Sequence, residues 1–313
     1  MTDLPGRTCP IRYRYGAQAL ASAPTREAQT LYVVGGLYGN LQALDTVEAL
    51  AACETGPVTV CFNGDFNWFN VDDAGFEAIN HRVLTHHAIA GNVEAELLAD
   101  SDESGCGCAY PDHVEMSVVE RSNRIHARLK TTAAHHPAIQ AQLATLPLFA
   151  RYQVGDCRVA VVHGDADSLA GWGFDIDVLS DPAQEPALLA AFEQAQVDVF
   201  ASTHTCQPVL RQLVKHSQAP VVINNGAAGM PNLHGSLAGI ITRIGVGPSP
   251  HAPLYGTRTA GVHIDALAVD YDHSLFEHAF LANWPSGSDA HTSYFKRIQG
   301  ALDLKVTQVL RVF

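Results

Sequence analysis

The chain has 313 residues, enough for one large α/β domain or for one domain with an appendage. Hydrophobic residues make up 47% of it, which excludes wholesale disorder, and no run approaches the roughly 18 apolar residues that a membrane-spanning helix needs. The formal net charge of −13 makes a nucleic-acid backbone a poor partner, although ordinary acidic solubility is the simpler explanation of this charge.

The N-terminal residues and the cysteines give an expectation for the cellular compartment of the protein. The opening residues, M-T-D-L-P-G-R-T-C-P, lack the basic and apolar regions of a secretory signal. The seven cysteines are odd in number and scattered, which favours reduced thiols in a cytoplasmic protein. Cys106 and Cys108 lie one residue apart in a loop, and are either metal ligands or ordinary loop thiols.

Three segments follow one another along the chain. We expect an N-terminal lead-in (1–28), a main domain (29–275) and a C-terminal extension packed on that domain (276–313). In the lead-in, residues 11–15 are predicted as an edge strand or a clamp on the domain. Neither an internal repeat nor a low-complexity tract interrupts the chain.

Six apolar runs in the main domain each end in a small or polar residue, which is typical of strands in a mainly parallel sheet. These runs are 31–34, 58–65, 87–90, 159–162, 198–201 and 221–223. Asn40 is a predicted N-cap for the first helix. Further helices are predicted near 72, at 94–99, over 123–146 with a break at Pro137, and at 186–196, and closing strands are predicted at 237–246 and 261–270.

Four of these runs lead into residues that can ligate a metal. They are Asp65, Asn92, His163 and His204. Ligands bind beyond the carboxyl ends of the strands in open α/β sheets, so these side chains are expected to meet. Singly, each is as well explained as a structural polar residue at a strand end. Together, one carboxylate, one amide oxygen and two imidazoles suit a divalent transition metal.

The series G-G-L-Y-G-N, N-G-D, G-N-V-E, V-H-G-D and T-H-T-C resembles the calcineurin-like metallophosphoesterase superfamily. The pattern of that family is D-x-H-G-N, G-D, G-N-H, H-G and G-H-T-H in the same order, and the match covers about residues 30–230. The chain looks most like the small bacterial phosphodiesterases that include diadenosine tetraphosphate hydrolase-like proteins. The resemblance implies an α/β fold: a four-layer αββα sandwich of two mixed β-sheets flanked by helices.

The resemblance also implies a dinuclear metal centre, and the departures from the pattern fall on one half of it. Ligands of the first metal are replaced by Gly36, Tyr38 and Cys206, while the bridging Asp65 is retained. The second set is whole: Asp65, Asn92, His163 and His204. We therefore expect one tight Mn²⁺, Zn²⁺, Fe²⁺ or Ni²⁺ ion and a doubtful second one. Val93 replaces the histidine that donates a proton in the family.

Several residues around this centre have two interpretations. Cys206 either holds a soft first metal or fills the space of the lost imidazole. Tyr38 either bonds a phosphate or a metal-bound water, or is a core aromatic. Asn67, Trp68 and Asp165 lie on turns beside the centre and are candidate substrate contacts.

We predict a metal-dependent phosphoesterase that hydrolyses a phosphomonoester or phosphodiester, nucleotides included, through metal-activated water. We expect its partner to be a small-molecule phosphoester or a nucleotide. We expect it to bind neither a membrane nor a nucleic-acid backbone. One alternative is an inactive protein of the same fold that senses a ligand or binds a partner, since three ligand positions and the proton donor are lost. A structural metal site in a protein of unrelated function is a third possibility.

Overall fold

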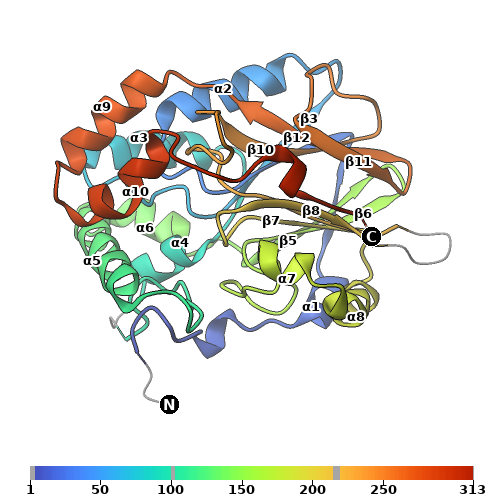
Figure 1. Cartoon of the computed structure of the whole chain (residues 1–313), viewed down its shortest axis with the longest axis horizontal. Helices are drawn as coiled ribbons and strands as arrows, with labels where there is room; N and C mark the ends of the chain where they lie inside the picture. Colours follow the sequence, from blue (N-terminus) through green and yellow to red (C-terminus); the bar gives the residue numbers. More distant parts are fainter. Residues whose placement is uncertain (1–3, 100–102, 214–218, 313) are drawn as a thin grey trace.

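The computed structural model describes residues 4–99, 103–213 and 219–312, and contains two mixed β-sheets with helices on both outer sides (Figure 1). The order of the six-stranded sheet is β11 (Tyr255–Thr259), β12 (Val262–Val269), β10 (Gly239–Gly245), β2 (Thr30–Val34), β3 (Val58–Asn63) and β4 (His87–Ile89). Strands β2, β3 and β4 are parallel, whereas β10, β11 and β12 are antiparallel to their neighbours.

The second sheet has seven strands. Its order is β1 (Thr25–Ala28), β5 (Phe149–Val154), β6 (Cys157–Val162), β7 (Val199–Ser202), β9 (Val221–Asn225), β8 (Pro208–Gln212) and β13 (Leu310–Val312). The central strands β6, β7 and β9 are parallel, and β5 and β8 run antiparallel to them. Segments near both ends of the chain thus join this sheet, through β1 and β13.

Alternation along the strands produces the layers. In β2, Leu31 and Val33 belong to the core between the two sheets, whereas Tyr32 and Val34 face the helices. All five residues of β2 are buried, as expected for a strand covered on both faces. The outer face of the second sheet, with Val162 and Phe200, packs on a separate helical layer.

The helices divide between the two outer layers. The six-stranded sheet is covered by α2 (Leu41–Ala52), α3 (Asp73–Val83), α4 (Asn92–Leu97), α5 (Met116–Ala133), α6 (Pro137–Leu143), α9 (His273–Asn283) and α10 (Asp289–Ile298). The seven-stranded sheet is covered by α1 (Ala17–Ala21), α7 (Ile176–Ser180) and α8 (Glu185–Ala195). The predicted four-layer αββα sandwich is therefore confirmed. Within the described residues, no helix has the length and apolar character needed to cross a bilayer.

Local features agree with the sequence at several points and differ at others. Asn40 caps α2, because its side chain accepts a hydrogen bond from Ala43 N. Ile11–Tyr13 forms a 3₁₀ turn rather than an edge strand, and Arg12 and Tyr13 both bond Glu96. The antiparallel strands β5, β8 and β11 were not predicted, since their burial depends on partners distant in the chain.

A buried ionic network fixes β10 against the first helical layer. Arg243 is 1% exposed, and its guanidinium bonds both Glu54, just after α2, and Asp265 of β12. A buried charge that loses its partner is costly, because neither water nor another ion compensates it.

We expect Arg243→Met to lower the free energy of unfolding by about 3–5 kcal/mol, since it leaves two carboxylates facing each other without a cation. Urea unfolding followed by circular dichroism measures this change. The matched control is Arg82→Met, whose guanidinium pairs with Asp45 and Glu48 on an open surface. That control is expected to change stability by no more than about 1 kcal/mol, and an equal loss in both variants would contradict the network's role.

Candidate metal centre and its pocket

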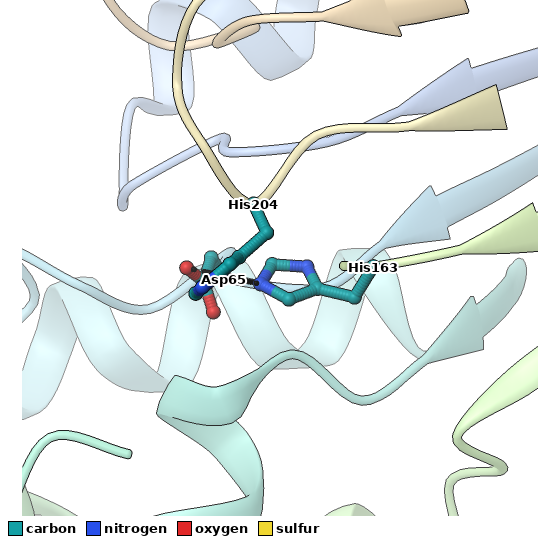
Figure 2. Close-up of side chains that lie close together, drawn as sticks. All are labelled: Asp65, His163 and His204. Atoms are coloured by element: carbon teal, nitrogen blue, oxygen red, sulfur yellow. Dashed lines mark hydrogen bonds and ion pairs between the residues drawn. The ribbon is translucent and has the colours of Figure 1, made fainter. Parts of the chain in front are cut away.

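Four side chains delivered by both sheets meet at one point. Asp65 follows β3, and Asn92 opens α4 after β4. His163 follows β6 directly, and His204 lies just beyond β7. Figure 2 shows Asp65, His163 and His204 pointing toward one another from three different turns. One ligand atom of each of these three lies within 4.8 Å of the others.

Backbone geometry makes this approach possible. Gly64 has φ +77°, and a Cβ there would lie 2.4 Å from the amide nitrogen of Gly91, so only glycine lets the two turns come this close. Asp65 itself has φ 55°, a left-handed conformation that costs a non-glycine residue about 1–3 kcal/mol and is concentrated at functional sites. The His163 carbonyl accepts hydrogen bonds from Thr203 N and His204 N, which ties the two histidine turns together.

A buried carboxylate holds the turn of Asp65. Glu94 Oε2 accepts from Asp65 N at 2.8 Å and from Gly91 N at 3.1 Å, and Oε1 accepts from Phe66 N at 3.1 Å. Burial and the charge of Asp65 raise the pKa of Glu94 to about 7, against these backbone donors, which favour the ionised form. Glu94 was expected only to begin a helix. In the structure it also positions the Asp65 carboxylate, because it holds the backbone of that turn.

The hydrogen bonds behind the histidines fix which ring nitrogen faces the centre. His163 Nδ1 lies 2.8 Å from the carbonyl oxygen of Asn63, and a carbonyl only accepts, so Nδ1 donates and Nε2 faces the cluster. His204 Nε2 lies 3.0 Å from the carbonyl oxygen of Cys108, which leaves Nδ1 facing the cluster. Asn92 Nδ2 donates to the Cys106 carbonyl, so its Oδ1 turns inward.

The cluster therefore consists of acceptor atoms aimed at one another. His163 Nε2 is 3.2 Å from His204 Nδ1, 3.1 Å from Asn92 Oδ1 and 3.4 Å from Asp65 Oδ2. Ligands held at 2.0–2.2 Å from a divalent metal lie about 3.0–3.5 Å from each other. Four lone-pair donors at these spacings repel unless a cation or a proton lies among them, so the residues present fit a divalent metal.

The titration of the cluster is consistent with this charge arrangement. Burial alone would raise the pKa of Asp65, but the His163 and His204 imidazoles lower it. Burial opposes protonation of His163, yet the carboxylate of Asp65 raises its pKa. Burial and the neighbouring His163 lower the pKa of His204 to about 3, so His204 is neutral and able to ligate.

Tyr38 fills the space between Gly36 and Cys206. Its hydroxyl lies 2.7 Å from Cys206 Sγ, and a Cβ on Gly36 would lie 3.0 Å from the Tyr38 ring. Cys206 does not belong to the acidic, histidine and cysteine cluster found among the described residues. Its role as a metal ligand stays a prediction, because its sulfur is hydrogen-bonded to the Tyr38 hydroxyl in this structure.

A pocket of about 160 Å³ opens on the centre. Its lining includes Asp65, Asn92 and His204 of the cluster. The other lining residues are Tyr38, Trp68, Val93, Cys108, Tyr110, Trp172, Thr205, Cys206 and Tyr294. Tyr110, Trp172 and Tyr294 were missed from the sequence, where only the Gly171-Trp172-Gly173 run offered a signal. Their rings come from segments far apart in the chain.

Two of the other predicted substrate contacts have structural partners. Asn67 is fully buried, exchanges hydrogen bonds with Asn80 and donates to Glu94. The Asp165 carboxylate accepts from the backbone N–H groups of Asp167, Ser168 and Gly173. Neither residue lines the pocket, so this geometry gives no support to a contact with substrate.

The expectation of reduced thiols is wrong for one pair. Cys106 and Cys108 form a disulfide, because the turn at Gly107 brings their sulfur atoms together. The carbonyls of these two cysteines accept the hydrogen bonds from Asn92 and His204, so the loop orients two ligands instead of holding a metal through sulfur. The other described cysteines, Cys9, Cys53, Cys61, Cys157 and Cys206, are free.

We expect a divalent metal such as Mn²⁺ or Zn²⁺ to raise the melting temperature of the protein, because it binds only the folded cluster. At a free concentration one hundred times the dissociation constant the gain is about 2.7 kcal/mol. His163→Ala should lower the affinity by at least about a hundredfold, and differential scanning fluorimetry with metal analysis after desalting measures both. The control is His81→Ala, an exposed histidine of α3. Equal metal-induced shifts in both variants would contradict the site.

Comparison with known proteins addresses the fold. No family model matches the chain, and no curated protein matches it. Among solved structures, a metallophosphoesterase from Sphaerobacter thermophilus has 15% identity and a TM-score of 0.54 over 87% of this chain and 100% of its own. The hypothetical protein PH1004 from Pyrococcus horikoshii OT3 has 14% identity and a TM-score of 0.55 over 84% and 96%. The chain therefore shares its fold with these two proteins, one of which is a metallophosphoesterase.

Proposed function

We propose that the protein is a metal-dependent phosphoesterase that hydrolyses a small phosphomonoester or phosphodiester, nucleotides included. One observation carries the proposal: four acceptor atoms of Asp65, Asn92, His163 and His204 converge beside a pocket, with their outer atoms fixed by hydrogen bonds. A divalent ion held there would lower the pKa of a water ligand and polarise a phosphoryl oxygen. The fold shared with metallophosphoesterases supports this reaction class.

The protein's own residues would orient the reaction. The carbonyls of Asn63 and Cys108 hold the two imidazoles in the tautomers that ligation requires. Val93 N donates to Asp65 Oδ1 at 3.2 Å, which leaves Oδ2 directed toward the histidines. The site is thus preorganised, which is where most of the rate enhancement of such centres originates.

We further propose that the centre works with one tight ion. Tyr38 has φ 54° and Cys206 has φ 58°, so both side chains are held in left-handed backbone conformations that direct them toward each other. Burial raises the pKa of Tyr38 well above its ordinary value and also raises that of Cys206. Two neutral groups that are hydrogen-bonded to each other are poor replacements for the carboxylate and the imidazoles that hold the first metal in the family.

A first prediction concerns activity. Metal-loaded wild type is expected to hydrolyse p-nitrophenyl phosphate or its methyl ester, and the release of p-nitrophenol is followed by its absorbance. His163→Ala should lower kcat/KM by at least about a hundredfold, because the metal loses a ligand.

His81→Ala is the control for that assay and should retain wild-type rates. Equal rates in wild type and His163→Ala would end the proposal. Metal binding without turnover of any phosphoester would favour the alternative of an inactive ligand sensor or partner-binding module.

A second prediction concerns the number of ions. The triple variant Gly36→Asp, Tyr38→His and Cys206→His restores the ligand types of the family's first site, and aspartate tolerates the left-handed conformation of residue 36 better than most residues. We expect metal analysis to rise from one ion per chain in wild type to two in this variant. Two tight ions in wild type would contradict the single-ion proposal.

A further inference from the structure

Five of the twelve residues that line the pocket beside the metal centre are tyrosine or tryptophan. Tyr38, Trp68, Tyr110, Trp172 and Tyr294 all face it. The Trp172 indole is fixed, because its Nε1 donates to the Cys108 carbonyl at 3.0 Å. Its ring lies edge-on to His204 at 5.5 Å and 5.9 Å from Tyr110. A fixed aromatic wall next to the reacting centre favours a planar group on the substrate.

The lining carries almost no positive charge. It includes one carboxylate, Asp65, and no lysine or arginine. Arg297 lies behind Cys206, where its guanidinium donates to the carbonyls of Cys206 and Pro231 and to Asn232 Oδ1. The side chains that face the pocket therefore offer no ion pair to a phosphate.

Charge balance then limits the substrate. A divalent ion together with the carboxylate of Asp65 leaves one net positive charge, because the Asn92 amide and the ligating imidazoles are neutral. A phosphodiester carries one negative charge and is neutralised by this site. A phosphomonoester carries close to two negative charges at neutral pH. Its second negative charge would enter the pocket without a partner, and an unpaired charge is unfavourable in a place shielded from water.

The hydroxyl groups around the pocket do not change this balance. Burial raises the pKa of Tyr110 to about 12, and raises those of Tyr38 and Tyr294 well above their ordinary value, so all three phenols stay neutral. Val93, which also faces the pocket, has no proton to give. A leaving group that is stable as an anion, such as a phenolate, is favoured accordingly.

We propose that this pocket selects singly charged phosphodiesters that carry a planar ring on one ester group, in preference to phosphomonoesters. The proposal rests on the phosphoesterase function and narrows its substrate class. The pocket volume of about 160 Å³ is small beside the roughly 300–1,000 Å³ of pockets that enclose drug-sized ligands, so it accommodates little more than the ring and the phosphoryl group.

The reaction consumes one water per diester. A bond forms between the water oxygen and phosphorus, and the bond from phosphorus to the leaving oxygen breaks with its electron pair. One proton of the water ends on the leaving alcohol, through solvent, and the other is released to solvent from the new P–OH group. The product is a phosphomonoester with a second negative charge, which the same charge balance disfavours in the site, so hydrolysis is expected to stop there.

The kinetic test compares two esters with one leaving group, p-nitrophenyl phosphate and methyl p-nitrophenyl phosphate. We expect kcat/KM of the metal-loaded protein to be at least about tenfold higher for the methyl diester. Phosphorus NMR should show methyl phosphate as the end product, without inorganic phosphate. A higher kcat/KM for the monoester, or release of inorganic phosphate from the diester, would overturn the inference.

A binding test removes the dependence on turnover. Trp68 and Trp172 face the pocket, so their fluorescence reports ligands, and diphenyl phosphate is expected to bind more tightly than phenyl phosphate. Tyr110→Leu should lower the affinity for diphenyl phosphate by about tenfold, since one ring is lost. Tyr110→Phe keeps the ring and should restore binding. Equal affinities in Tyr110→Leu and wild type would exclude a ring-binding role for Tyr110 and contradict the proposal.

The two tests separate the inference from the function on which it rests. If the loaded protein hydrolyses neither ester, the hydrolase function fails, and the fluorescence titration alone decides the pocket's preference. Tighter binding of phenyl phosphate than of diphenyl phosphate would then overturn the preference as well. Hydrolysis of both esters with the monoester favoured would leave the function standing and remove the inference.

Discussion

The structure depends on one electrostatic constraint: four hydrogen-bond acceptors face one another in a buried space. His204 Nδ1, Asn92 Oδ1 and Asp65 Oδ2 lie 3.1 to 3.4 Å from His163 Nε2. The outer nitrogens of Asn92, His163 and His204 donate to the carbonyls of Cys106, Asn63 and Cys108, and Asp65 Oδ1 accepts from Val93 N. Such an arrangement is stable only with a positive charge at its centre, which a divalent cation or a proton supplies.

The rest of the fold is arranged to maintain that constraint. Parallel strands from two sheets deliver the four residues to one edge, and Glu94 holds the turn of Asp65 through three backbone donors. The disulfide-closed loop of Cys106 and Cys108 presents the carbonyls that orient Asn92 and His204. Beside this cluster, Tyr38 and Cys206 form a hydrogen bond with each other. The result is a cluster of four convergent side chains beside a pocket with aromatic lining.

Much of this could be predicted from the sequence, because each ligand directly follows an apolar strand. The order of Asp65, Asn92, His163 and His204 along the chain, with the glycines beside them, was sufficient to place them at one sheet edge. The two-sheet sandwich could be inferred only through the resemblance. Strand periodicity alone indicated a parallel sheet and did not reveal the antiparallel partners β5, β8 and β11, whose burial depends on long-range pairing.

The supporting residues were less accessible to sequence reasoning. Tyr110, Trp172 and Tyr294 come from a loop, a turn and a terminal helix, and no local pattern brings them together. The sequence drew attention to Cys106 and Cys108. Their backbone carbonyls orient Asn92 and His204, and this role does not depend on the type of side chain, so the sequence could not indicate it. Asn67 and Asp165 stay predictions as substrate contacts; in this structure both form hydrogen bonds within the protein, as polar residues on turns near a site commonly do.

An anomalous-difference map from a crystal grown with Mn²⁺ or Zn²⁺ tests the central claim most directly. The account predicts one strong peak per chain at about 2.0–2.2 Å from ligand atoms of Asp65, Asn92, His163 and His204, with Tyr38 still bonded to Cys206. Two peaks bridged by Asp65, or no peak among these four side chains, would contradict it.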